Sequence, residues 1–104
     1  MTKSEITKGT TYKLCVEVQN DDGTIVDLSG YSGRMAIRHH YNDVKIVDAE
    51  VAIEIPNKII VMLSSTVTSL LNETNLYGTL EIIKEEEVIL IEQFEFQIFP
   101  NTNL

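Results

Sequence analysis

The side chains that could do chemistry in this chain of 104 residues are few and widely spaced. His39 and His40 are adjacent, and Asp43 follows three residues later, which invites interpretation as a metal site. Adjacent residues of a strand point to opposite faces, so one ion would need a loop to gather both imidazoles, and the chain has no third histidine. We therefore assign no metal site to this cluster and expect no metal or other cofactor.

Candidate nucleophiles and paired acids lack the partners that catalysis requires. Cys15 is the only cysteine, and it lies in the strand-like residues 12–18 without a base at a recognisable spacing, so we interpret it as structural. Ser29 and Ser32 have no patterned histidine and aspartate partners. The Glu-rich residues 84–87 are typical of a solvated hairpin end rather than of two carboxyls in a cleft. The sequence therefore predicts a protein that is not an enzyme.

Composition indicates one globular domain that avoids nucleic acid and membranes. Hydrophobic residues make up 43% and charged residues 23% of the chain, as expected for a packed core. The net charge of −8 opposes binding to phosphates, and no apolar run approaches the roughly 18 residues that span a bilayer. The N-terminus lacks the apolar region of a secretory signal, so we expect the product to stay in the cytoplasm in which it is made.

The charges are unevenly distributed along the chain. A group that we call the basic island contains Arg34, Arg38, His39, His40 and Lys45. An acidic C-terminal part contains Glu81, Glu85, Glu86, Glu87, Glu92 and Glu95. In one interpretation, the two charged groups are the solvated surfaces of two separate hairpins. The other is a contact between subunits in which the basic island meets the acidic hairpin, and this makes the basic island and Glu85, Glu86 and Glu87 the candidate assembly surface.

The dominant hydrophobic period is two, which predicts strands. Residues 12–18, 44–47, 51–55, 76–83 and 88–99 have strand character, 24–26 would be a short return strand, and in residues 31–38 apolar side chains alternate with arginines. The apolar run 59–63 predicts a central strand that is buried on both faces. Residues 88–91 would be a poor edge if left bare, so we expect them to be central or paired across a subunit contact. Pro100 should end the last strand.

Turn signals separate these stretches and complete the expected fold. Asn20-Asp21-Asp22-Gly23 and Asp27-Leu28-Ser29-Gly30 predict tight turns. Ser64 or Ser65 can cap one short helix within residues 64–72, which would cross between sheets. The pattern predicts an all-β chain, an antiparallel β-sandwich of about seven strands with one short helical crossover. Residues 1–8 would be a flexible N-terminal tail or arm.

The order of these motifs resembles a known group of proteins. The first half has a strand after Gly9-Thr10-Thr11, then an Asp-Asp-Gly turn, then Val26-Asp27-Leu28-Ser29-Gly30 and the strand 34–38. The second half has the segments 59–63, 63–71 and 76–82, followed by a strand that ends near Pro100. Small bacteriophage virion proteins with an immunoglobulin-like β-sandwich have a similar order, as does the N-terminal domain of siphophage baseplate upper proteins. Pro56-Asn57-Lys58 departs from the pattern, which has a Gly-rich turn there.

The resemblance implies a non-enzymatic structural protein located in the virion. Baseplate proteins continue into a helix and receptor-binding parts, whereas this chain ends at Leu104, so the resemblance implies an accessory or adaptor component of head, neck, tail or baseplate. Its partners would be other phage structural proteins and further copies of itself in a homo-oligomer. Two alternatives remain open: an inhibitor of a host defence enzyme that uses its acidic region to imitate nucleic acid, and a carbohydrate-binding sandwich module.

Overall fold

The described chain folds mostly into strands. The computed structural model describes residues 1–40, 44–72 and 75–102. Its elements are β1 (Thr2–Thr7), β2 (Tyr12–Glu17), β3 (Ser32–Arg38), β4 (Lys45–Asp48), β5 (Glu50–Glu54), β6 (Lys58–Leu63), α1 (Ser65–Ser69), β7 (Asn75–Lys84) and β8 (Glu87–Phe99). The predicted all-β class is confirmed. The described residues contain eight strands, where about seven were expected.

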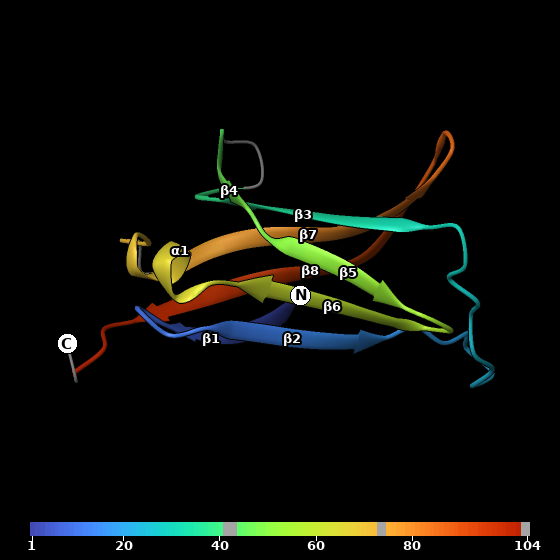
Figure 1. Cartoon of the computed structure of the whole chain (residues 1–104), viewed down its shortest axis with the longest axis horizontal. Helices are drawn as coiled ribbons and strands as arrows, with labels where there is room; N and C mark the ends of the chain where they lie inside the picture. The colour runs from blue at the N-terminus through green and yellow to red at the C-terminus, as the bar shows by residue number, and fades with distance from the viewer. Residues whose placement is uncertain (41–43, 73–74, 103–104) are drawn as a thin grey trace.

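Two sheets form the layers of the fold (Figure 1). The larger sheet has the strand order β1-β8-β7-β3-β4, and the smaller sheet has the order β2-β6-β5. Tyr12, at the start of β2, joins the layers, because its hydroxyl shares a 2.8 Å hydrogen bond with the Ser4 hydroxyl of β1 and its ring meets Phe96 edge-on. Burial raises the pKa of Tyr12 above its ordinary value.

Alternate residues of the strands build the core between the sheets. On β3 the side chains of Met35 and Ile37 are fully buried, whereas Arg34 points outward, as the alternation predicts. Further core side chains come from β7 and β8 of the same sheet, from β6 of the facing sheet and from the turn before β3. The largest buried ones include Phe94, Phe96, Leu28, Ile59, Leu63, Leu76, Leu80 and Ile82. Burial of each such side chain contributes about 1.5–3 kcal/mol.

Strand β6 is central in its sheet as predicted, but only one of its faces is buried. Ile59, Val61 and Leu63 lie in the core, whereas Ile60 and Met62 on the outer face remain partly exposed. The expectation of burial on both faces is therefore wrong. A three-stranded sheet has one neighbouring layer here, and no described segment covers its other side.

The N-terminus is a strand and differs from the expected flexible arm. Residues of β1 pair in register with β8, from Thr2 opposite Phe94 to Thr7 opposite Phe99. This pair is parallel, so the expectation of a purely antiparallel sandwich is also incorrect. Ile6 supplies the physical reason, because its buried side chain anchors an otherwise polar segment to the core.

The chain changes sheet four times, and the last two crossings are β4 to β5 and β6 to β7. Between β4 and β5 a single residue, Ala49, makes the crossing, and its amide donates to the Met35 carbonyl at 2.9 Å. Between β6 and β7 the crossing is α1, capped by Ser64 as predicted. Buried Thr68 fixes the helix, because its hydroxyl donates to the Thr10 carbonyl at 2.7 Å.

Strands β7 and β8 form a long hairpin that extends beyond the rest of the sheet (Figure 1). Its register shifts between Leu80 and Glu81. Strand β8 ends at Phe99, immediately before Pro100, as predicted. The expected return strand 24–26 is reduced to one isolated bridge, between Gln19 and Ile25.

Gly78 provides a test of how tightly this core is packed. A Cβ atom at this position of β7 would lie 2.9 Å from the Phe96 ring and 3.0 Å from the Met35 sulfur. We expect Gly78→Ala to lower the free energy of unfolding by about 1–3 kcal/mol, because overpacking displaces well-packed neighbours. Urea denaturation measures this, with Ser32→Ala at an exposed strand position as the control. Equal unfolding midpoints for Gly78→Ala and wild type would contradict the packing described.

Candidate functional site

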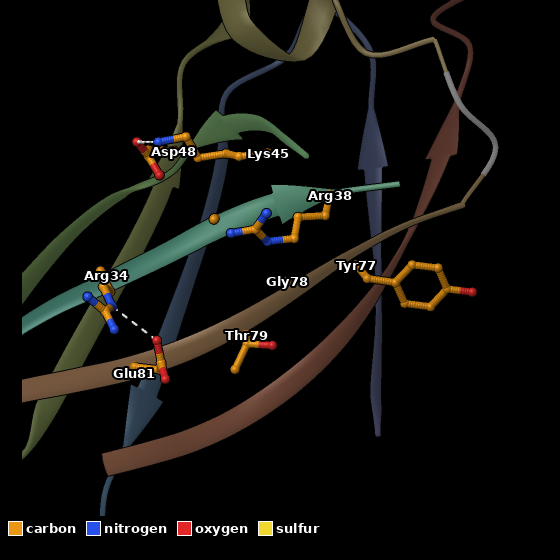
Figure 2. A pocket seen from close by; sticks show the side chains of 9 residues that line it. Arg34, Arg38, Lys45, Asp48, Tyr77, Gly78, Thr79 and Glu81 are labelled. Atoms are coloured by element: carbon orange, nitrogen blue, oxygen red, sulfur yellow. Dashed lines mark hydrogen bonds and ion pairs between the residues drawn. The ribbon is translucent and has the colours of Figure 1, made fainter. Parts of the chain in front are cut away.

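The outer face of the larger sheet is hollowed where β3, β4 and β7 lie side by side. This outer hollow has a volume of about 390 Å³ and is lined by Arg34, Ala36, Arg38, Lys45, Asp48, Tyr77, Gly78, Thr79 and Glu81 (Figure 2). The strand register explains the gathering, because Arg34 stands opposite Glu81, and Arg38 stands between Tyr77 and Lys45. The structure therefore brings together three members of the basic island.

Two ion pairs within the chain occupy part of the hollow. Arg34 Nε donates to Glu81 Oε1 at 3.0 Å, and Lys45 Nζ donates to Asp48 Oδ2 at 2.8 Å (Figure 2). The Arg34 side chain remains 58% exposed, so solvent weakens its pair. Three cationic side chains and two carboxylates line the hollow of a chain of net charge −8. The hollow is therefore a surface of mixed charge.

The two histidines lie beside the hollow rather than in it. The rings of His39 and His40 have centroids 4.4 Å apart, and the His40 ring stacks on Tyr77 at 6.1 Å. Asp43, the third member of the metal hypothesis, lies outside the described residues. Among the residues that are described, no three side chains of histidine, cysteine, aspartate or glutamate are grouped so as to hold a metal ion.

The acidic members of the candidate assembly surface lie far from the basic ones. Glu85 and Glu86 form the turn between β7 and β8, whereas Tyr77, which lines the hollow, lies near the other end of β7. The hydroxyl of Tyr31 donates to Glu87 at 2.8 Å and Lys84 lies over the Tyr31 ring, so the base of the turn is braced against the loop before β3. Within one chain, the basic island and this turn do not meet.

The turn at residues 27–30 sets the start of β3. Asp27 Oδ1 accepts hydrogen bonds from the amide and the hydroxyl of Ser29, at 2.9 and 2.7 Å. Leu28 is fully buried, and Gly30 has a φ of 84°, a conformation that glycine adopts without strain. The Tyr31 amide then donates to the Leu28 carbonyl at 3.1 Å, and β3 follows with its arginines directed outward.

Sequence reasoning missed the acidic half of the hollow. Asp48 falls between the expected strands 44–47 and 51–55, and Glu81 was grouped with the acidic C-terminal part. The Arg34–Glu81 pair depends on the register between β3 and β7, which are 47 residues apart at this point. The sequence did carry one signal for this pair: Arg34 and Glu81 have opposite charges, and each lies in a segment that was predicted to be a strand.

Comparison with known proteins gives no family for the chain. No protein-family model matches it, and no curated protein matches it either. Within the described parts of the structure, the single helix is far shorter than a bilayer-crossing helix requires.

The Arg34–Glu81 pair can be tested by a double-mutant cycle. We expect Arg34→Ala and Glu81→Ala to show a favourable coupling of about 0.2–1 kcal/mol in unfolding free energy, because exposed ion pairs are screened by water. Chemical denaturation at low salt measures it. A matched cycle between Arg34 and Glu5, which lies on β1, should show no coupling. A zero or unfavourable coupling for Arg34 and Glu81 would contradict the pairing.

The turn at residues 27–30 makes a prediction about pH. The hydrogen bonds from Ser29 lower the pKa of Asp27 below its ordinary 3.8. Because the folded-state pKa is depressed, the stabilisation is present above pH 3.8 and is lost as the pH falls through the lowered pKa. We therefore expect Asp27→Asn to destabilise the protein near neutral pH and the difference from wild type to shrink on acidification. A difference that grows toward low pH would contradict this account.

Proposed function

We propose that the chain is a non-enzymatic phage structural protein, an accessory or adaptor component of the virion. It acts by contacts with other structural proteins and with further copies of itself. The motif order from Gly9-Thr10-Thr11 to Pro100 and its resemblance to phage virion proteins support the phage assignment. The net charge of −8 supports proteins rather than nucleic acid or anionic membranes as partners.

The proposal includes an immunoglobulin-like topology. The order β8-β7-β3-β4 in the larger sheet corresponds to G-F-C-C′ of a variable-type domain, and β2-β6-β5 corresponds to B-E-D. The one-residue crossing at Ala49 then takes the chain from C′ to D. This correspondence in strand order supports the topology that the motif resemblance implied.

One observation carries the assembly role. Val88 and Leu90 lie on a strand of the larger sheet and are 48% and 54% exposed. Consecutive exposed apolar residues on a strand are an aggregation hazard unless a partner covers them. A protein that joins a particle gains such a partner. The charged outer hollow on the same sheet would orient that partner.

Incorporation into particles tests this proposal. Mass spectrometry of purified particles, made from the phage genome that encodes the chain, should detect the chain in a fixed ratio to the major structural proteins. We expect Arg34→Glu combined with Arg38→Glu to reduce that ratio several-fold, because the outer hollow would repel an acidic partner. Lys13→Glu, a charge reversal on the smaller sheet, should leave it unchanged. Absence of the wild-type chain from the particles would refute the proposed function.

A further inference from the structure

The long strand β8 has an edge that is only half covered. On one side it pairs with β7 from Glu87 to Gln97. On the other side β1 pairs with residues 94–99 only. Residues 87–93 therefore have no neighbouring strand on that side among the residues that the structure describes. Their outward backbone groups are available to a further strand.

The side chains of this uncovered edge are apolar and exposed. Residues 88–91 are Val-Ile-Leu-Ile, and Val88, Ile89 and Leu90 are 48%, 37% and 54% exposed. Natural sheets guard bare edges with lysine, proline or an inward charge, and residues 88–91 contain none of these. Glu87 and Glu92 flank the apolar run, and Glu92 already accepts a hydrogen bond from Thr2 at 2.8 Å. The edge is thus apolar with acidic ends.

Strand β4 is the opposite edge of the same sheet, and it also presents apolar side chains. Val44, the residue before β4, is 87% exposed, and Ile46 of β4 is 47% exposed. Lys45 lies between them, and it stands opposite Arg38 in the register of β3 and β4. The β4 strand has four residues, so it fits within the seven uncovered residues 87–93 of β8.

We propose that the partner of the uncovered β8 edge is the β4 edge of a second copy of this chain. Each contact adds β4 of one copy to β8 of the next and continues the five-stranded sheet from copy to copy. The inference deepens the proposed assembly role and rests on it for its biological purpose, but it concerns the purified chain alone.

Strand direction agrees with this contact. In the larger sheet β8 is antiparallel to β7, β7 to β3, and β3 to β4, so β4 and β8 run in opposite directions. When a copy is added with its strands in the same sense, its β4 therefore pairs antiparallel with β8. Antiparallel pairing is also the arrangement that β8 already has with β7 on its other side.

Charge selects this contact over pairing of two β8 edges. In a two-fold antiparallel pairing centred between Ile89 and Leu90, Glu87 of each copy would stand opposite Glu92 of the other, and like charges directly opposite are destabilising. In an antiparallel pairing of β4 with β8, Lys45 can instead stand opposite Glu92, and Asp48 then stands opposite Ile89. Lys45 is paired with Asp48 in its own chain, but both side chains are exposed, so this pair competes weakly. Only the β4–β8 contact covers both edges at once.

The contact is heterologous, because each copy contributes a different surface. Such contacts close into a ring when the rotation between copies allows it and otherwise continue as a filament. One copy blocked at β8 and another blocked at β4 can still join each other once and then stop. This property separates the proposal from every two-fold alternative.

Two blocked variants provide the test, with mass measured by light scattering and sedimentation velocity. The first carries Val88→Asn and Leu90→Asn, which remove apolar surface from the β8 edge. The second carries Lys45→Glu and Ile46→Glu, which place repulsive charge on the β4 edge. The control carries the same chemical change at exposed sites away from both edges, Ile25→Asn and Leu70→Asn, which are 57% and 72% exposed in wild type.

We expect wild type and control to form assemblies larger than a dimer, whose size falls with salt. Each blocked variant should be monomeric alone, and an equimolar mixture of the two should give a heterodimer and nothing larger. A monomeric wild type at all concentrations would overturn the proposal. So would a dimer of the β4-blocked variant alone, which indicates β8–β8 pairing, or a dimer of the β8-blocked variant alone, which indicates β4–β4 pairing.

A second measurement avoids dependence on the folding of the β8-blocked variant. Adding increasing amounts of the β4-blocked chain to wild type should shorten the assemblies, because this chain accepts a neighbour on only one edge. Unchanged assembly size would contradict the contact. The two proposals fail separately: a chain that is monomeric when pure but present in particles refutes this contact alone, whereas self-assembly without incorporation refutes the virion role alone.

Discussion

The structure depends on the unequal lengths of β8 and the strands beside it. The C-terminal half of β8 is held between β1 and β7, and there it places Phe94, Phe96 and Ile98 into the core. The N-terminal half, beyond the register shift at Leu80 and Glu81, keeps β7 as its one neighbour in the described chain. The same strand therefore stabilises the domain at one end and presents apolar surface for assembly at the other.

The exposed charges select which strand edges pair, but they do not supply the main binding energy. The ion pairs of Arg34 with Glu81 and of Lys45 with Asp48 neutralise much of the basic island within the chain. The outer hollow thus holds cationic and acidic side chains together, whereas the hairpin turn at the far end of the sheet is acidic. Exposed charges contribute little binding energy, but they decide which edges can approach each other. The apolar edges supply the affinity, and the charges select the pairing.

The sequence predicted those features that local chemistry determines. Alternation placed Met35 and Ile37 in the core and Arg34 outside, Ser64 capped the helix, and Pro100 followed the last strand. Features that depend on distant segments were missed. Residues 2–7 are mostly polar and therefore resemble a flexible arm in the sequence. In the structure, Ile6 is buried in the core and the backbone of these residues pairs with β8. The one-residue crossing at Ala49 was also invisible, because it requires knowing that its two flanking strands belong to different sheets.

The candidate site followed the same rule. The cations of the hollow were recognisable from their spacing, since Arg34 and Arg38 share the outward face of one strand. Their partners were not, because register between strands far apart in sequence decides whether Glu81 or another acid stands opposite. The expectation that residues 88–91 are central or paired between subunits stays a prediction. Within the described chain they are paired on one side only, which makes the subunit contact the part left to test.

Amide hydrogen exchange of the wild-type chain, followed as its concentration rises, tests the central claim most directly. A contact between β4 and β8 predicts that protection increases in residues 44–48 and 87–92 together, while amides of β2 and β5 at the edges of the smaller sheet stay unchanged. Protection that does not depend on concentration in either segment, or that rises in only one of them, would contradict the account.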